Sequence, residues 1–199
     1  MGNKINALGF RIPKFYCWNS KWILNKKNLI EDILIRNYIK KNFDNKYINN
    51  IFIEKSAENY IVLINSSKPG IIIGRSGINI KNMKFFFKKK YINVYISVKE
   101  TINLEINSDN ISKNICFSIE KRKNYKRIIN IHMEKAMNYA IRGIKITISG
   151  RLNGSDIARK ETFKLGKVQL IKINNKVSYS KSLSKTKYGI ICVKVWINF

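Results

Sequence analysis

The chain has 199 residues, of which 45% are hydrophobic, and it carries 39 lysines and arginines against 12 aspartates and glutamates. The hydrophobic fraction excludes a disordered polyelectrolyte, and the length suffices for one large or two small domains that bury a core without disulfides. A formal net charge of +27 is far more than solvation of the surface requires, so it indicates a polyanionic partner.

The arginines are a better indicator of this partner than the lysines. The chain has 37 isoleucines, 31 lysines and 26 asparagines, all residues with codons rich in adenine and thymine, so codon bias can supply lysines that have no function. We therefore give more weight to the arginines, which are Arg11, Arg36, Arg75, Arg122, Arg127, Arg142, Arg151 and Arg159.

The first half of the chain is expected to form an arm followed by a small domain. Residues 1–25 mix glycine, proline, basic and aromatic residues without periodicity, which is typical of an arm that packs or binds. Strands are predicted over 47–55, 59–66 and 91–99. An amphipathic helix is predicted from Asn28 to Phe43 by apolar residues at helical spacing, which are Ile30, Ile33, Leu34 and Tyr38.

The stretch GIIIGRSGINI (70–80) contains the four-residue loop Gly74, Arg75, Ser76 and Gly77. Glycines at both ends let a ligand approach the backbone closely, and the second glycine opens a helix whose free N–H groups attract phosphate. A G-x-x-G loop after helix–strand–strand and before helix–strand is typical of a prokaryotic-type (type II) KH domain, whose loop clamps about four nucleotides. The alternative is a plain strand-to-helix turn. Walker and Rossmann loops are excluded, since no G-K-[ST] and no third glycine follow.

The second half of the chain is predicted to be an α+β domain of two helices packed on a mainly antiparallel four-stranded sheet. Ser108 or Asp109 can cap its first helix, whose buried stripe is Ile111, Ile115 and Ile119. The second helix is expected from about Asn124 to Ile141.

A change to alternation with period two marks the strands of this half. Ile144, Ile146 and Ile148 alternate with polar residues, and further strands are expected over about 160–174, 176–184 and 189–198. We therefore divide the chain into an arm (1–25), a KH type II domain (26–106) and a C-terminal α+β domain (107–199).

Two basic segments of the second half are candidates for binding nucleic acid. In EKRKNYKR (120–127), Lys123, Lys126 and Arg127 fall on one face of the expected helix together with Asn130. The opposite face is apolar and consists of Tyr125, Ile129, Met133, Ala136 and Ala140. A cationic face on a packed helix suits contact with phosphates, and the alternative is a solvated helix end.

The second basic segment is GRLNGSDIAR (150–159), in which Gly150 and Gly154 allow a tight bend. We expect Arg151 and Arg159 to reach RNA phosphates, with Asp156 orienting them. The alternative is an internal pair of arginine and aspartate.

Nothing in the sequence argues for catalysis, a metal site, a cofactor or a small-molecule substrate. Cys17, Cys116 and Cys192 lack C-x-x-C spacing, which argues against zinc or disulfides and fits a reducing compartment. His132 is the only histidine, and the carboxylates form no H-E-x-x-H or D-x-D pattern. The longest apolar run, residues 60–64, is far too short to span a membrane, so we expect a soluble intracellular protein.

Several stretches in chain order resemble bacterial-type small-subunit ribosomal protein S-three. The opening MGNKINALGFRI, WNSKW (18–22) and PGIIIGRSG (69–77) resemble its start and its KH loop, and YGIICVKVWI (188–197) resembles its closing strand. The most specific stretch is GIKITISGRLNGSDIARKE (143–161), which resembles the hallmark of the family's second domain.

The resemblance implies a KH domain followed by an α+β domain, in a component of the head of the small ribosomal subunit. It implies binding to rRNA, a position along the channel through which mRNA enters, help in unwinding mRNA there, and contacts with neighbouring head proteins. Under this hypothesis Arg122, Lys123, Lys126 and Arg127 face incoming mRNA. The rRNA would be bound by Lys4, Arg11, Arg151 and Arg159.

Two departures from the family predict weaker unwinding. The family's cationic helix usually carries two adjacent basic residues and a further one a turn later, and here Lys126 and Arg127 are followed by Asn130. The sequence also ends at Phe199, directly after the last expected strand, without the basic tail of many relatives.

Two other functions are retained at this stage. A free KH-domain regulator of RNA would not need the second-domain segment, and an RNA- or DNA-processing enzyme would need a carboxylate or metal cluster. The codon-biased composition indicates a reduced bacterial or an organellar genome. The expected location is therefore the ribosome of a bacterial cytoplasm or of an organelle's matrix or stroma.

Overall fold

The computed structural model describes residues 5–44, 47–56, 59–101 and 103–199. It divides the chain into two compact units. The first unit is Trp18–Ile102, and the second combines the segment up to Cys17 with Asn103–Phe199. Whether the domains end at residues 25 and 106, as the sequence analysis places them, stays a prediction.

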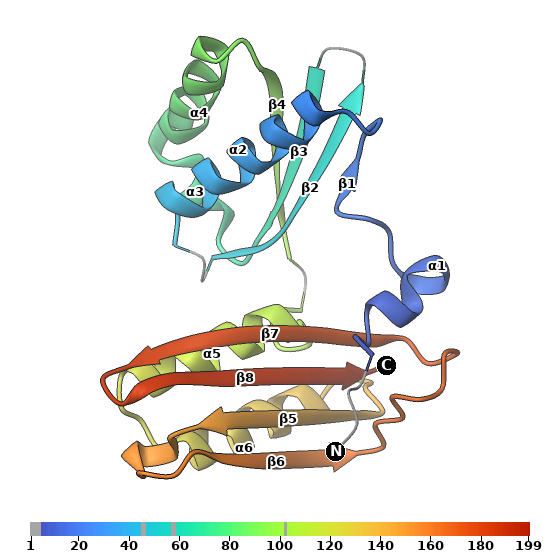
Figure 1. Ribbon diagram of the computed structural model, residues 1–199, viewed down its shortest axis with the longest axis vertical. Helices are drawn as coiled ribbons and strands as arrows, with labels where there is room; N and C mark the ends of the chain where they lie inside the picture. The colour runs from blue at the N-terminus through green and yellow to red at the C-terminus, as the bar shows by residue number, and fades with distance from the viewer. Residues whose placement is uncertain (1–4, 45–46, 57–58, 102) are drawn as a thin grey trace. The chain divides into compact units, whose positions relative to one another are not determined.

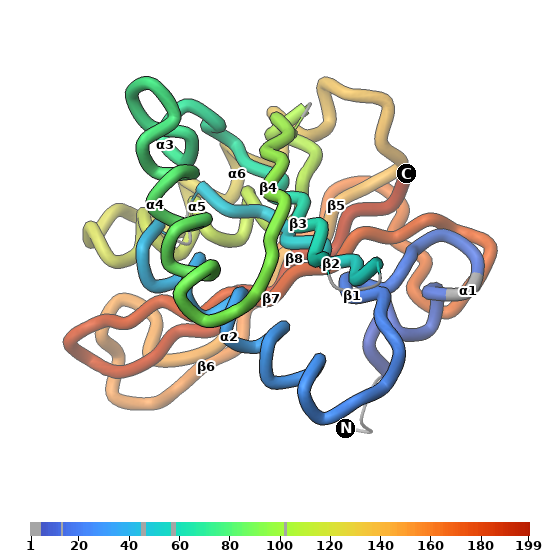
Figure 2. The backbone as a smooth tube through the Cα atoms, turned by 90° about the horizontal axis from the view of Figure 1, so that it is seen from above, coloured from blue at the N-terminus to red at the C-terminus, as the bar shows by residue number. Residues whose placement is uncertain are grey.

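The first unit is a four-stranded sheet with helices on one face (Figures 1 and 2). The strand order is β1-β2-β3-β4, in which β2 and β3 are antiparallel while the outer pairs β1–β2 and β3–β4 are parallel. Its elements are β1 (Ser20–Lys21), α2 (Lys26–Asn42), β2 (Ile48–Ser56), β3 (Asn59–Ser66), α3 (Pro69–Ile73), a 3₁₀ helix (Arg75–Gly77), α4 (Ile78–Lys89) and β4 (Asn93–Glu100).

Helix α2 lies where the sequence predicts it, and Leu34 and Tyr38 of the predicted apolar stripe pack against the core. Ile35 and Ile39 are fully buried, whereas Ile30 and Ile33 of the predicted apolar stripe are about half exposed. The buried face also contains a polar group, since Asp32 is buried and forms an ion pair with Arg36 at 3.1 Å. Arg36 also donates to the Ile51 carbonyl (2.8 Å), so this pair fixes the buried face of α2 against the sheet.

The second unit is an antiparallel sheet with α5 and α6 covering one face (Figure 1), which confirms the predicted α+β architecture. The strand order is β6-β5-β8-β7. Its elements are a 3₁₀ helix (Gly9–Arg11), α1 (Ile12–Phe15), α5 (Ser108–Glu120), α6 (Tyr125–Met137), β5 (Gly143–Gly150), a 3₁₀ helix (Leu152–Gly154), β6 (Arg159–Gly166), β7 (Val177–Thr186) and β8 (Gly189–Asn198).

The core of this unit follows the sequence pattern closely. Ile144, Ile146 and Ile148 are fully buried, as their alternation predicts, and they pack against Ile111 and Ile115 in one cluster with α5. The cap of α5 differs from the prediction, because the side chain of Asn107 accepts the Asp109 N–H at 3.0 Å. Helix α6 ends earlier than expected, and Ala140 is therefore exposed.

Serine hydroxyls line the contact between α5 and β7. The Ser108 and Ser178 hydroxyls lie 2.6 Å apart, and the Ser112 hydroxyl lies 2.9 Å from that of Ser180 and 2.8 Å from that of Ser182. Ser108 and Ser112 are buried, so these hydroxyls satisfy one another where water does not reach.

Strand β6 ends at Gly166, well before the predicted residue 174, and the chain continues as a loop (167–176). Arg11 holds this loop. Its guanidinium is fully buried and donates to the carbonyls of Leu170 (2.8 Å), Lys172 (2.8 Å) and Asn175 (2.8 Å), and to that of Ala7 (3.0 Å). The assignment of Arg11 to rRNA is corrected here, since a buried guanidinium with four carbonyl partners does not reach a phosphate.

The role of Arg11 predicts a large loss of stability on substitution. Arg11→Met keeps the volume but leaves four carbonyls without their donor, so we expect the free energy of unfolding to fall by roughly 3 kcal/mol in urea denaturation. Lys14→Met is the matched control, because Lys14 is exposed, donates to Asn174 (2.7 Å) and lies 5.7 Å from the Phe15 ring, and it should change stability by less than about 0.5 kcal/mol. Equal stability of the two variants would contradict the role of Arg11.

Candidate nucleic-acid interface

The glycine loop connects α3 to α4 through backbone torsions that favour glycine. Gly74 has φ +73° and ψ +174°, and Gly77 has φ +73° and ψ +18°. Both glycines have positive φ, which side chains rarely adopt, and Gly77 directly precedes α4 as predicted. The left-handed torsion of Ser76 (φ +50°) and the short helix α3 before the loop were not foreseen.

Asn79 holds the loop against the start of α4. Its side-chain amide donates to the Ile71 carbonyl at 3.1 Å. The same amide lies against Gly74, where a Cβ would come within 2.8 Å of it. Arg75 and Ser76 are exposed. The loop thus presents backbone and one cation outward while its base is fixed.

The start of α4 is electrostatically open to an anion. Its first turn contains no acidic residue, and no side chain caps it. The Ile78 N–H donates to the Arg75 carbonyl, but no side chain competes for the rest of the turn, and the helix dipole adds positive potential at this end. Arg75 adds a full charge next to this end, so the geometry suits a phosphate group.

The second candidate, which we call the α5–α6 ridge, consists of Arg122, Lys123, Lys126 and Arg127. Lys123 lies in the turn before α6 and not on the helical face where the sequence placed it, since α6 begins at Tyr125. Arg122 lies in the same turn with φ +57°. Lys126 and Arg127 occupy the first turn of α6, and all four side chains are exposed.

The ridge has a rigid base and unneutralised charge. Tyr125, Ile129 and Met133 are buried beneath α6, which confirms the predicted apolar face at these positions. In the described part of the chain, none of the four cations is in an ion pair. Two cations at a helix N-terminus oppose the helix dipole, so this placement does not serve the stability of α6.

Arg151 and Arg159 have different surroundings. Arg151 donates to the Ser155 carbonyl (2.8 Å) and pairs with Asp156 at 3.1 Å. The side chain of Arg151 is 39% exposed and that of Asp156 is 99% exposed, so water screens the pair. Arg159 opens β6 and is exposed. The internal pair considered from the sequence is therefore present at Arg151, and its guanidinium still faces solvent.

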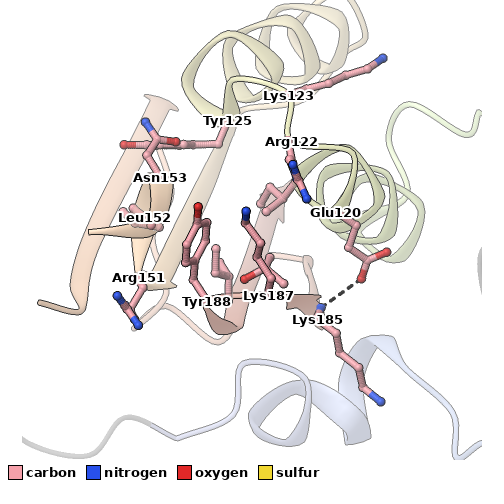
Figure 3. Close-up of a pocket in the computed structure, with 14 residues that line it drawn as sticks. Glu120, Arg122, Lys123, Tyr125, Arg151, Leu152, Asn153, Lys185, Lys187 and Tyr188 are labelled. Atoms are coloured by element: carbon pink, nitrogen blue, oxygen red, sulfur yellow. Dashed lines mark hydrogen bonds between the residues drawn. The ribbon is translucent and has the colours of Figure 1, made fainter. Parts of the chain in front are cut away.

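The structure brings residues of both basic segments to one cavity of about 320 Å³ (Figure 3). Arg122 and Lys123 line it from the α5–α6 turn, and Arg151 lines it from the end of β5. Sequence analysis missed Lys185, Lys187 and Tyr188 of the β7–β8 turn, which line it as well. The signal that could have identified them is KTKYG (185–189), in which two lysines and a tyrosine lie between two predicted strands and precede a glycine.

Charges around this cavity are unbalanced. Five of its lining residues are cations, and Glu120 is the one carboxylate among them. Glu120 accepts the backbone N–H of Lys185 at 3.1 Å. In Figure 3, Lys123 points away from the cavity, whereas Lys187 and Tyr188 extend along it. The cavity is therefore a place of positive potential.

Other polar groups show little sign of catalytic chemistry. Among the described residues, no three histidines, cysteines or carboxylates come together as a metal site would require. Burial raises the pKa of the Cys116 thiol to about 12, and burial followed by the charge of Lys135 lowers the pKa of His132. In the described ranges, no helix is long and apolar enough to cross a membrane. Lys4 lies outside the described residues.

Fold and candidate sites together define an RNA-binding protein of the KH class with a second, cationic α+β unit. Residues 34–106 match the model of the family described as "KH domain", and residues 115–197 match "Ribosomal protein S3, C-terminal domain". The chain belongs to the family of small ribosomal subunit protein uS3, as its relatives make plain.

Three relatives carry the name "Small ribosomal subunit protein uS3". That of Polynucleobacter asymbioticus is 37% identical over 202 residues, which cover 99% of this chain and 74% of the relative. That of Nitrosomonas eutropha is 37% identical, with 99% and 94% covered. That of Karelsulcia muelleri is 38% identical over 203 residues, with 99% and 88% covered. The chain is accordingly a structural, RNA-binding component of the small ribosomal subunit and acts in translation.

The loop torsions predict that its two glycines differ in tolerance to alanine. Gly77→Ala places a Cβ in open space at a left-handed torsion and should cost about 1 kcal/mol. Gly74→Ala forces alanine into a region of φ and ψ that is essentially restricted to glycine, and its Cβ displaces Asn79. The free energy of unfolding should therefore fall by about 3 kcal/mol. Urea denaturation of both variants measures this. Equal costs would show that the loop is not held as described.

Proposed function

We propose that the chain binds rRNA in the head of the small subunit and lines the channel through which mRNA enters, where it helps to hold and unwind incoming mRNA. The observation that carries this proposal is the α5–α6 ridge. Its four exposed cations have no internal partner within the described ranges, and a packed helix fixes two of them. Fixed cations can bind the phosphates of separated strands without reading bases.

Unwinding needs no catalytic group in this mechanism. Translocation of mRNA supplies the work, and the cations of the ridge lower the free energy of the single strands relative to the duplex. Asn130 is exposed one turn after Lys126 and Arg127, and it can donate a hydrogen bond but adds no charge. The ridge should therefore act more weakly than one with a third cation.

The KH loop and the segment around Arg151 and Arg159 are assigned to RNA in the same proposal. The loop offers the positive end of the α4 dipole and the exposed Arg75, and the guanidinium groups of Arg151 and Arg159 are exposed at least in part. Neighbouring head proteins are proposed as further partners. The proposed location is the ribosome in a bacterial cytoplasm or in an organelle's matrix or stroma.

The KH loop is tested by reversing its charge. Arg75→Asp with Ser76→Asp places anions at a helix N-terminus meant for phosphate, so the affinity of the full chain for single-stranded RNA should fall roughly tenfold. Fluorescence polarisation at matched salt measures it. Lys26→Asp with Lys27→Asp is the control, since it changes more charge at the exposed first turn of α2. If the loop variant binds RNA no more weakly than this control, the assignment of the KH loop to RNA is wrong.

The ridge is tested in translation. Ribosomes carrying Lys126→Ala with Arg127→Ala should cross a stable mRNA hairpin severalfold more slowly, and Asn130→Lys should speed the crossing. Unstructured messages should be read at the parental rate by both. Lys160→Ala with Lys164→Ala, two exposed cations of β6, is the matched control. If the assembled double alanine variant crosses hairpins at the parental rate, the ridge does not serve this purpose.

A further inference from the structure

The cavity beside the ridge has a chemistry that the ridge alone does not explain. We propose that it receives one unstacked nucleotide of an RNA strand, with the phosphate on the cations at its rim and the base against its apolar floor. The inference rests on the proposed RNA-binding function and assigns Lys185, Lys187 and Tyr188 to it.

The walls of the cavity come from three segments that are distant in sequence. They are the turn between α5 and α6, the 3₁₀ helix Leu152–Gly154, and the turn between β7 and β8. Each segment contributes a cation to the rim, namely Arg122, Arg151 and Lys187, whereas the side chains of Lys123 and Lys185 point away from the cavity in Figure 3. A phosphate bound here would be approached by cations from several directions, which a single helix face does not offer.

The floor of the cavity is apolar. Leu152 is 2% exposed and Ile191 is 5% exposed. Tyr125 lines it too, and its hydroxyl is already engaged by Glu161 at 3.1 Å. The small parts of these side chains that reach the cavity are carbon, and the larger apolar surface belongs to Tyr188, which is 45% exposed. A bare phosphate would leave that surface unused.

Tyr188 supplies an aromatic wall whose position is fixed. Gly154 lies against its ring with φ +78°, and a Cβ there would come within 3.0 Å of the ring. Lys187 lies 4.9 Å and Arg151 5.9 Å from the ring centroid. The ring is 45% exposed, so part of it remains accessible to a ligand. An aromatic ring among cations is the usual combination for binding an unstacked base and its phosphate.

Size and surroundings favour a nucleotide within a strand. A volume of about 320 Å³ lies at the lower end of ligand pockets and exceeds what a phosphate alone fills. An acidic peptide could pair with the cations, but its carboxylates would gain nothing from the floor. Arg122 and Lys123 belong both to the cavity and to the ridge, so a strand leaving the cavity passes further cations.

The test uses the full chain with methyl groups labelled for NMR. We titrate it with hexauridylate, with uridine monophosphate and with inorganic phosphate. The expected result is that hexauridylate shifts the methyl signals of Leu152 and Ile191, which lie on the floor, and leaves that of exposed Leu183 on β7 unchanged. Inorganic phosphate should shift neither floor signal. Shifts at lower concentration with the monophosphate than with hexauridylate would assign the site to a free nucleotide instead of RNA.

Substitutions distinguish the contribution of the base contact to RNA affinity from that of the phosphate contact. Tyr188→Leu should weaken hexauridylate binding about tenfold without changing the slope of log affinity against log salt, because stacking involves no counterion release. Lys187→Gln should reduce that slope by roughly 0.7, the value for one phosphate contact on a single strand. Lys181→Gln, an equal charge change on exposed β7, is the control. It should leave the floor signals' response to hexauridylate intact.

The outcomes distinguish this proposal from the proposed function. If RNA binds without shifting the floor signals, and Tyr188→Leu and Lys187→Gln behave like Lys181→Gln, the cavity is overturned as a nucleotide site. In that case, a loss of RNA affinity in Lys126→Ala with Arg127→Ala would still support RNA binding by the ridge. Conversely, floor shifts and the Tyr188→Leu effect would support the cavity even if the ridge variant translates hairpins normally.

Discussion

The shortage of carboxylates is the constraint on which this structure depends. With 12 acidic residues for 39 basic ones, the chain cannot neutralise its charge through ion pairs. Cations that the fold needs inside are therefore satisfied mainly by carbonyl oxygens: Arg11 donates to four of them, and Arg36 adds the Ile51 carbonyl to its single aspartate. Most of the remaining cations lie at the surface in excess of the carboxylates, so they favour an anionic partner.

Each candidate site would contact RNA through a different kind of interaction. The loop before α4 offers the positive end of the helix dipole and needs glycine at Gly74 for its torsion. The ridge offers side-chain charge on a helix whose opposite face is packed. The cavity joins charge to carbon surface. A strand can thus be held by its phosphates in one place and by a base in another, without any sequence being read.

Sequence patterns predicted what depends on neighbours in the chain. The alternation around Ile146 and the order of elements around Gly74 and Gly77 are local signals, and the structure agrees with them. Arg11 could not be interpreted correctly, because its carbonyl partners beyond Ala7 lie more than 150 residues away. The same holds for the cavity, whose walls meet only after folding, and for the ion pair of Asp32 and Arg36 on the buried side of α2.

The serine contacts between α5 and β7 have a mechanical consequence. Apolar side chains can slide past one another at little cost, whereas the Ser108–Ser178 contact and the position of Ser112 between Ser180 and Ser182 are lost on sliding. Any shear of α5 along β7 would break them together and leave buried hydroxyls without partners. A force applied to the turn after α5 is therefore transmitted to the whole sheet. The helix keeps its register relative to β7 under this force.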